Sequence, residues 1–446
     1  MVAVSVEQGF VILEGAVASV EKWREALHVD HPTIAALLTQ GVFQRSRAAD
    51  GQVRLRLNMV GLLATSKKAF FCLPKICADG GVDLLASTRH ALAAVQTYHK
   101  HVKRGPDTSR SGEADIFLGG GALLDHFLRL WEWTRDFGLH HDEEPVREDG
   151  YRSINWRATI GNSLPVHRSS SVIYPEAIGQ KFVKSLSNLG ILQAFYLERL
   201  RVFLGDLANI WSDKYDSIWD FCRETISDSD LYFDEAFIRS VLDEYEGLCT
   251  RDDDRELLGL LKGCFEGSYS RSAAPILYGV SSFHVVWEHM CSSLLREIGS
   301  PQSHPAIASQ PSYDLKGSVA ELEPQRPDIL RSIGEGIIIG DAKWYMIDAE
   351  ELPGTPDAIK QFSYQGSIVE GKVVVGNFLF LPTLSNIPWD HLGCLVMKSK
   401  QGRDDRFPSV QLIGLAWENM VSLYAKGGHF KPDFSNWLAE VGSRTS

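Results

Sequence analysis

Three features that define other protein classes are missing from this 446-residue sequence. None of its seven cysteines forms a CxxC pair, so the spacing indicates neither a zinc ribbon nor a disulfide framework, and we expect buried, reduced thiols. No run of about 18 apolar residues occurs, and no basic segment precedes the first apolar stretch. We therefore expect a cytoplasmic protein without a membrane span or secretory signal. A GxxxxGKS/T phosphate-binding loop is also missing, which leaves nucleotide hydrolysis to another protein.

Negative charge dominates the sequence, but it is unevenly spread. The formal net charge of −12 argues against a general nucleic-acid coat protein. Residues 1–110 carry +5, residues 111–275 carry −12 and residues 276–446 carry −5. We therefore expect a nucleic-acid contact to be local and to lie in the first range, and we expect the acidic middle range to contact protein.

The apolar pattern divides the chain at the same places and predicts a multidomain α/β fold. Residues 1–110 combine short strands with a helix over 83–102, which predicts a small mixed α/β domain that binds DNA or a partner. Residues 111–275 have mostly helical periodicity. Residues 276–446 alternate helices with β-branched strands, as expected of a mixed, largely buried sheet with helices on its faces.

Two polar segments interrupt the helical middle range. The stretch 147–160 shows no helical periodicity, so we expect it to be non-helical. We expect Asn155 and Trp156 within it to have a structural role, with the tryptophan side chain packed against the protein. His140 and His141 precede three acidic residues and so are metal-ligand candidates. Adjacent side chains point in different directions on any regular element, however, so a solvated loop is the expectation here.

The strongest chemical signal is a pair of charged residues at the end of an apolar strand. Asp341 and Lys343 are two residues apart and would share one face of that strand. A hairpin through 332–336 would bring Asp328 beside Asp341. Two converging carboxylates suit Mg²⁺, with Mn²⁺ as a substitute. The alternative is a solvated strand end with an incidental ion pair, but charges there are costly unless they act together.

This arrangement predicts phosphodiester hydrolysis. The metal would hold the scissile phosphate and make its bound water more acidic, while Lys343 would orient that water and offset the charge that develops at phosphorus. The segment resembles the PD-(D/E)xK nuclease pattern, with Pro327-Asp328 followed by Asp341-Ala342-Lys343. The expected core is therefore the α/β/α core of that nuclease class.

The PD-(D/E)xK resemblance implies further site residues on the two flanking helices. Glu288 is the candidate for another metal ligand or a ligand of metal-bound water, and an exposed helix charge is the alternative. Gln361 and Tyr364 lie one helical turn apart and share a face. Gln361 would contact the phosphate or the attacking water, and an ordinary polar face is the alternative.

Over most of its length the chain resembles the LlaJI family of restriction endonucleases, which are related to McrC. The likeness rests on residues 57–76, on the Ile154-Asn155-Trp156 patch that continues to Ile160, on the nuclease core and on the Lys360-Gln361-x-x-Tyr364 helix. Asp341 stands where many relatives have glutamate. The resemblance implies a bacterial DNA-cleaving subunit, active in restriction or phage defence, that works with an AAA+ motor related to McrB.

The expected partners are double-stranded DNA, the AAA+ NTPase and a second copy of the chain in a homodimer. Candidates for DNA contact, with a solvated face as the alternative, are Lys67, Lys68, Lys100, Lys103, Arg104, Lys360 and Tyr364. Two other hypotheses remain: a catalytically silent adaptor that binds DNA and regulates a partner NTPase, and a nuclease-like fold that acts on RNA or repair intermediates. The intact set of Asp328, Asp341 and Lys343 favours an active enzyme.

Overall fold

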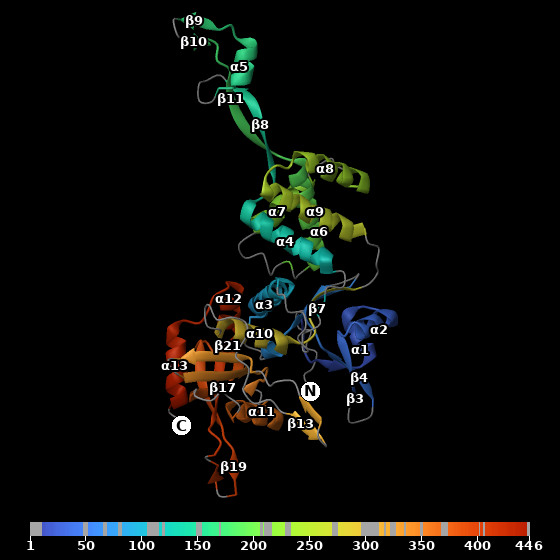
Figure 1. Ribbon diagram of the computed structural model, residues 1–446. Coiled ribbons are helices and arrows are strands. Elements are labelled where there is room, and N and C mark those ends of the chain that lie inside the picture. The colour runs from blue at the N-terminus through green and yellow to red at the C-terminus, as the bar shows by residue number, and fades with distance from the viewer. Residues whose placement is uncertain are drawn as a thin grey trace. The chain divides into compact units, whose positions relative to one another are not determined.

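Figure 1 shows the computed structural model of the chain. It describes residues 11–47, 52–65, 69–78, 83–104, 116–117, 121–148, 154–168, 171–205, 208, 216–227, 233–269, 275–295, 312–315, 318–321, 327–333, 336–347, 351–366, 373–400, 402–404 and 406–443. The chain forms two compact units. The first combines residues 1–119 with 274–446, and the second is residues 120–273.

Two sheets build the N-terminal part of the first unit. A five-stranded sheet has the order β1 (Val11–Leu13), β6 (Ala69–Leu73), β5 (Val60–Ala64), β12 (Ile276–Val280) and β7 (Ile116–Phe117). A three-stranded sheet has the order β2 (Val17–Ala18), β4 (Val53–Leu57) and β3 (Phe43–Arg47). The short strands expected within residues 1–110 are thereby confirmed, among them β4, β5 and β6.

Strand β12 follows the second unit in sequence yet pairs antiparallel with β5 of the N-terminal sheet. Gly61 and Gly279 face each other in this pair, and Gly61 has a φ of +134°. A Cβ on Gly61 would lie 2.2 Å from the Tyr278 carbonyl oxygen, so the close approach of the strands requires glycine. Strand β12 lies at the start of residues 276–446, the range expected to form the nuclease domain, yet it belongs to the N-terminal sheet.

Among the described residues, three short helices and one long helix accompany these strands. They are α1 (Val20–Leu27), α2 (His31–Thr39), the 3₁₀ helix η1 (Lys75–Ala78) and α3 (Leu84–Arg104). The side chains of Ser19 and Asp30 cap α1 and α2 by accepting from backbone N–H groups in the first turn. Trp23 is buried in the core between α1 and the three-stranded sheet, and its indole donates to the Leu55 carbonyl oxygen at 2.9 Å. The helix expected over 83–102 is confirmed as α3.

A second five-stranded sheet organises the C-terminal part of the first unit. Its order is β15 (Ile329–Ile333), β16 (Gly336–Ala342), β17 (Val373–Thr383), β21 (Val410–Ala416) and β18 (Trp389–Leu395). Strands β16, β17 and β21 run parallel, whereas β15 and β18 are antiparallel edges. Its helices are α10 (Phe283–Leu295), α11 (Thr355–Gly366), α12 (Trp417–Ala425) and α13 (Pro432–Ser443). Two small ribbons pair β13 (Ser312–Leu315) with β14 (Ser318–Glu321) and β19 (Lys398–Ser399) with β20 (Gly402–Arg403).

The second unit is mostly helical, as expected, with a long two-stranded ladder. Its main helices are α4 (Gly121–Phe137), α6 (Asn188–Leu204), α7 (Asp216–Ser227), α8 (Glu235–Leu248) and α9 (Asp252–Tyr269). The ladder pairs β8 (His141–Glu148) with β11 (Gly179–Leu186). At its far end lie α5 (Trp156–Asn162) and the ribbon of β9 (Val166–Arg168) and β10 (Ser171–Ile173), as Figure 1 shows.

The structure corrects three expectations for this unit. The segment 147–160 is not wholly non-helical, because α5 begins at Trp156, where the Asn155 side chain caps it by accepting from the Ala158 N–H at 2.9 Å. Trp156 stays 56% exposed, so the expectation that it packs was wrong, although its ring meets Tyr174 edge-on. The stretch after His140 is a strand rather than a loop, because it pairs with β11, about 40 residues later in sequence.

None of the helices within the described parts of the chain is long and apolar enough to cross a membrane. The longest, α3, carries charged and histidine side chains along its length, and its apolar positions pack on β5, β6 and α12. The apolar faces of the first unit are therefore used in packing between layers.

Candidate functional site

The hairpin of β15 and β16 brings the expected acidic residues together. Ile329 pairs with Gly340, so Asp328, directly before β15, lies beside the end of β16. Asp328 Oδ2 accepts a hydrogen bond from the Ala342 backbone N–H at 2.9 Å. The hairpin predicted from the sequence is confirmed, and it joins Asp328 to the strand end that carries Asp341.

Asp341 and Lys343 form a buried ion pair at this strand end. Asp341 Oδ2 lies 2.5 Å from Lys343 Nζ, and Asp341 is only 1% exposed. The backbone N–H of Lys343 donates to the Phe380 carbonyl oxygen at 2.9 Å, which holds the residue against β17. A buried charge needs a partner of opposite sign, so each member of this pair depends on the other.

Helix α10 places Glu288 next to the pair. The indole N–H of Trp287 donates to the same Phe380 carbonyl oxygen at 3.3 Å, so α10 and the end of β16 share one anchor on β17. Glu288 Oε1 then lies 3.9 Å from Lys343 Nζ. Three carboxylates, those of Asp328, Asp341 and Glu288, thus face one ammonium group.

Crowding of carboxylates changes the proton affinity of the site. Burial, followed by the charges of Asp341 and Glu288, raises the pKa of Asp328 to about 8. Burial also raises the pKa of Glu288, with Lys343 opposing and Asp341 adding to that rise. Burial alone would lower the pKa of Lys343, but Asp341 and the other two carboxylates raise it, so the ammonium stays charged. When all three carboxyl groups are ionised, their negative charge exceeds the positive charge of Lys343.

One buried oxygen of the site has no hydrogen-bond partner. Asp341 Oδ1 is that atom, and Lys360 Nζ lies 3.9 Å from it. Within the described residues, no three His, Cys, Asp or Glu side chains already stand as a metal-binding group. Mg²⁺, however, commonly takes one or two carboxylates and fills its other positions with water. The oxygens of Asp328 and Asp341, in a site with excess negative charge, fit such an ion.

Helix α11 places Lys360 near the site, whereas its two other candidate site residues, Gln361 and Tyr364, are buried. Lys360 Nζ also lies 5.4 Å from the centre of the Tyr364 ring. Gln361 is buried, and its Nε2 donates to Asn377 Oδ1 at 2.6 Å and to the Phe378 carbonyl oxygen at 3.0 Å, while its Oε1 has no hydrogen-bond partner. Tyr364 packs with isoleucines of β16. Burial holds the pKa of Tyr364 far above its ordinary value, so the phenol stays neutral.

Of the other residues expected to contact DNA, the structure describes the side chain of Lys100. Lys67 and Lys68 lie outside the described residues. Lys100 is exposed on α3, which packs on α10 and α12. Lys103 and Arg104 end α3, and their side chains lie outside the described part of the chain.

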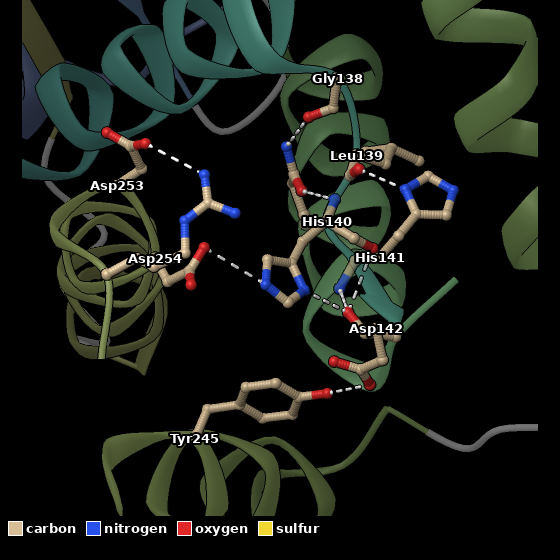
Figure 2. Close-up of polar contacts among 12 residues, drawn as sticks. Gly138, Leu139, His140, His141, Asp142, Tyr245, Asp253 and Asp254 are labelled. Atoms are coloured by element: carbon tan, nitrogen blue, oxygen red, sulfur yellow. Dashed lines mark hydrogen bonds and ion pairs between the residues drawn. The ribbon is translucent and has the colours of Figure 1, made fainter. Parts of the chain in front are cut away.

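His140 and His141, the metal-ligand candidates of the second unit, make contacts of a different, structural kind (Figure 2), and His141 Nδ1 lies 2.7 Å from the Leu139 carbonyl oxygen. His140 Nδ1 lies 2.7 Å from Ser187 Oγ, and His140 Nε2 lies 3.5 Å from Asp254 Oδ1. The His140 backbone N–H donates to Gln193 Oε1 at 3.1 Å, and Gln193 Nε2 donates to Thr134 Oγ1 at 2.6 Å. These contacts fasten the first residues of the β8–β11 ladder to α4, α6 and α9.

Sequence reasoning missed the groups that position the site. The Phe380 carbonyl oxygen and the Ala342 backbone N–H are main-chain atoms, which leave no side-chain signal. Trp287, directly before Glu288, offered the one visible clue, because a buried indole N–H needs an acceptor. Asn377, which bonds Gln361, follows the glycine at a register shift between β16 and β17 and carried no pattern in the sequence.

Three kinds of likeness to known proteins accompany this geometry. The family model for the LlaJI restriction endonuclease matches residues 59–390. A curated relative from Bacillus subtilis (strain 168), the type II restriction enzyme BsuMI component YdjA, is 23% identical over 426 residues, which cover 90% of this chain and 86% of the relative.

Two solved structures from Thermococcus gammatolerans are also similar. One is described as a refined half-complex from a tetradecameric assembly of McrB AAA+ hexamers with bound McrC. The match has 13% identity and a TM-score of 0.37, and it covers 94% of this chain and 98% of the other. The second is described as the McrBC complex, with 10% identity, a TM-score of 0.27, and coverage of 66% and 89%. The family model extends over well more than half of the sequence, and the chain therefore belongs to the LlaJI restriction endonuclease family.

Proposed function

We propose that this chain is the DNA-cleaving component of a restriction system and that it hydrolyses phosphodiester bonds with Mg²⁺ or Mn²⁺. Asp328 and Asp341 are the proposed metal ligands, and Glu288 holds a metal-bound water. The observation that carries the proposal is the buried ion pair of Asp341 and Lys343 beside Asp328, in a chain of a restriction endonuclease family. Assignment of the β15–β18 sheet as a PD-(D/E)xK core is part of the same proposal.

Each side chain of the site has a separate task. A divalent cation held by Asp328 and Asp341 would supply positive charge to the scissile phosphate and would make water beside it more acidic. Lys343 keeps its proton among three carboxylates, so its ammonium can offset charge on the phosphate. The Asp328 carboxyl, whose pKa is raised to about 8, must release its proton before it can act as a ligand. Lys360 adds a second cation near Asp341, on the helix that borders the site.

An AAA+ NTPase is the proposed partner of the second unit. The sequence has no GxxxxGKS/T loop, and the curated relative is described as one component of a restriction enzyme. Apolar side chains stand exposed at the end of the β8–β11 ladder: Trp156, Ile160, Leu164, Val166, Val172 and Ile173. We name this set the ladder-tip patch. Exposed apolar patches of this kind commonly mark contacts with other proteins, so we assign the partner to this patch.

Plasmid cleavage tests the enzymatic part of the proposal. Wild-type chain, with its partner NTPase, should cut plasmid in Mg²⁺ and not in EDTA. Lys343→Ala should cut roughly 10²–10³-fold more slowly, because the phosphate loses its charged contact. Lys431→Ala is the matched control, because Lys431 is exposed before α13, and it should cut at the wild-type rate. DNA binding without any cleavage by the wild type would instead favour the silent adaptor.

Co-purification tests the partner assignment. The AAA+ NTPase encoded in a neighbouring reading frame should bind the wild type and lose at least about tenfold in affinity for the double variant Ile160→Asp/Leu164→Asp, because charge replaces apolar contact. Val202→Asp changes an equally exposed apolar residue on α6 and should bind as the wild type does. Equal binding by all three proteins would remove the ladder-tip patch as the docking surface.

A further inference from the structure

Strands β3 and β4 concentrate positive charge in a chain whose net charge is −12. Arg45 and Arg47 lie on β3, and Arg54 and Arg56 lie on β4, while neither strand contains an acidic residue. We name these four side chains the arginine ribbon. Arg45 and Arg47 are two residues apart on one face of β3, and Arg54 and Arg56 are two residues apart on one face of β4, so each strand holds two like charges close together that a bound anion would stabilise.

The register fixes which way each arginine points. Gln44 pairs with Arg56 and Ser46 pairs with Arg54, so both arginines of β4 stand on a polar face of the sheet. Arg45 and Arg47 share the opposite face with Phe43, where Arg45 is exposed beside the buried Leu55 and Arg47 is exposed opposite Val53. The ribbon thus presents guanidinium groups on both of its sides.

A packed core holds the ribbon rigidly. Phe43, Leu55 and Leu57 are buried, and the rings of Trp23 and Phe43 lie 4.9 Å apart. The Trp23 indole donates to the Leu55 carbonyl oxygen, which ties α1 to the middle of β4. The arginines therefore project from a fixed base, and little conformational entropy of the backbone is lost when they bind.

Protection of a sheet edge is the ordinary explanation for charges on short strands. It can account for Arg45 and Arg47, because β3 is an edge strand. It does not account for Arg54 and Arg56, because β4 is the central strand of the three and pairs on both sides. Among the described residues, no acidic side chain forms an ion pair with Arg45, Arg47 or Arg56.

An ion pair lies between the ribbon and the surroundings of the nuclease site. Lys75 Nζ lies 2.6 Å from Glu351 Oε2, in the segment that follows the end of β16. Burial alone would raise the pKa of Glu351, but the hydrogen bond and charge of Lys75 and the charge of Arg56 lower it. Burial, then the charges of Lys343 and Lys75, lowers the pKa of His284 on α10. The Lys75–Glu351 pair thus lies near enough to Arg56 and to His284 for their charges to interact, while Glu351 balances the charge of Lys75.

We propose that the arginine ribbon binds the phosphate backbone of the DNA duplex that the Asp328–Asp341–Lys343 site cuts. The choice of DNA as the anion rests on the proposed function. Guanidinium groups suit this role because their planar donors match phosphate oxygens and remain charged at every physiological pH. Backbone contacts hold the duplex in place without reading its sequence.

Fluorescence anisotropy of a labelled DNA duplex in EDTA tests the ribbon without any need for cleavage. The full chain is titrated at several salt concentrations. Arg54→Gln/Arg56→Gln should lose about tenfold in affinity at moderate salt, and the slope of log affinity against log salt should fall by about 2, because two phosphate contacts are removed. Arg45→Gln/Arg47→Gln should lose a similar amount.

Two further variants separate the ribbon from net charge and from folding. Arg251→Gln/Arg255→Gln removes the same charge from exposed positions at the start of α9 and should bind DNA as the wild type does. Arg54→Lys/Arg56→Lys keeps the charge and should retain most of the salt slope while losing the bidentate geometry. Circular dichroism spectra of all variants should match that of the wild type.

The outcomes distinguish this inference from the proposed function. If the wild type binds DNA through the ribbon but does not cut it in Mg²⁺, the ribbon assignment holds and the nuclease proposal fails. If both Gln variants of the ribbon bind DNA with wild-type affinity and slope, the ribbon assignment is wrong, whether or not the chain cuts. Unchanged DNA binding together with lost binding of the partner NTPase would identify the ribbon as a surface for an acidic protein, and would also overturn the inference.

Discussion

The two units each bury a cluster of polar side chains, and the clusters differ in how completely their atoms are paired. At the base of the β8–β11 ladder, Gln193 uses both ends of its amide, and His140 has a partner at each ring nitrogen. Burial and a hydrogen bond to Asp142 raise the pKa of Tyr245 to about 12, so its hydroxyl stays a donor. Every polar group named in this cluster has a partner within the protein.

The cluster at the end of β16 is not balanced in this way. Asp341 Oδ1 is buried without a hydrogen bond, and mutual repulsion among carboxylates helps to raise the pKa of Asp328 to about 8. Buried polar atoms are normally satisfied, and departures concentrate where a protein acts on something else. The difference indicates that the ladder cluster serves the fold, whereas the β16 cluster is arranged for a ligand that the chain itself does not supply.

The largest expected effect comes from the unbalanced cluster. Asp341→Asn should slow DNA cleavage by roughly 10³-fold, because the site loses a proposed metal ligand and the partner of Lys343. The melting temperature should stay within a few degrees of the wild-type value, because Lys343 keeps Glu288 and Asp328 as opposite charges and repulsion among the carboxylates falls at the same time. Cleavage is followed on plasmid, and melting is followed by circular dichroism.

Asp390→Asn is the matched control for that change. Asp390 is exposed on β18, where it accepts from the backbone N–H of the next residue, a bond that asparagine can keep. Its cleavage rate and melting temperature should match those of the wild type. If Asp341→Asn cut DNA at the wild-type rate, the cluster at the end of β16 would have no part in cleavage. If that variant unfolded, the cluster would serve the fold, as the cluster at the base of the β8–β11 ladder does.

Disruption of the paired cluster should instead cost stability. Gln193→Ala leaves the His140 N–H, the Thr134 hydroxyl and the Gly138 carbonyl without their present partner, so α6 should lose about 3 kcal/mol of protection. Native-state hydrogen exchange of α6 measures that loss. Gln40→Ala, at the exposed C-cap of α2, should change protection by less than about 0.5 kcal/mol. A loss no larger than that of the control would show that the ladder base is held by other contacts.

The pH dependence of cleavage is a smaller effect and follows from Asp328. Its pKa is raised, so at limiting Mg²⁺ the cleavage rate should rise by up to about tenfold per unit between about pH 6 and 8 and then level. The folded chain keeps a proton that the unfolded chain has already released above about pH 4. The free energy of unfolding of the first unit should therefore fall as pH rises from about 4 to 8, and less so in Asp328→Asn. A cleavage rate that does not change over this pH range would show that ionisation of Asp328 is not needed for the reaction.

Short-range chemistry was the part of the structure that the sequence predicted well. The β15–β16 hairpin and the Asp341–Lys343 pair depend on residues close together in the chain, so spacing and periodicity sufficed. The β8–β11 ladder and the pairing of β12 with β5 join residues far apart, and nothing local marks their partners. Helix α5 was missed because it spans only seven residues and is held by one cap at Asn155.

The exposed fraction of individual side chains also could not be predicted from the sequence. Trp156 resembles a core residue by type, but its place at the end of the ladder leaves it open to contact. Gln361 resembles a surface residue of an amphipathic helix, but Asn377 draws its amide into the interior. Both depend on which surfaces the neighbouring elements cover, and tertiary packing alone decides that.

Binding of Mn²⁺ tests the central claim most directly, because it asks whether the unbalanced cluster holds a cation without relying on cleavage. The chain is titrated with Mn²⁺ and the free ion is followed by electron paramagnetic resonance, for the wild type, Asp328→Asn/Asp341→Asn and Asp390→Asn. The account predicts a Mn²⁺ site in the wild type and in Asp390→Asn that is lost or weakened at least about tenfold in the double variant. Equal Mn²⁺ binding by all three proteins would contradict it.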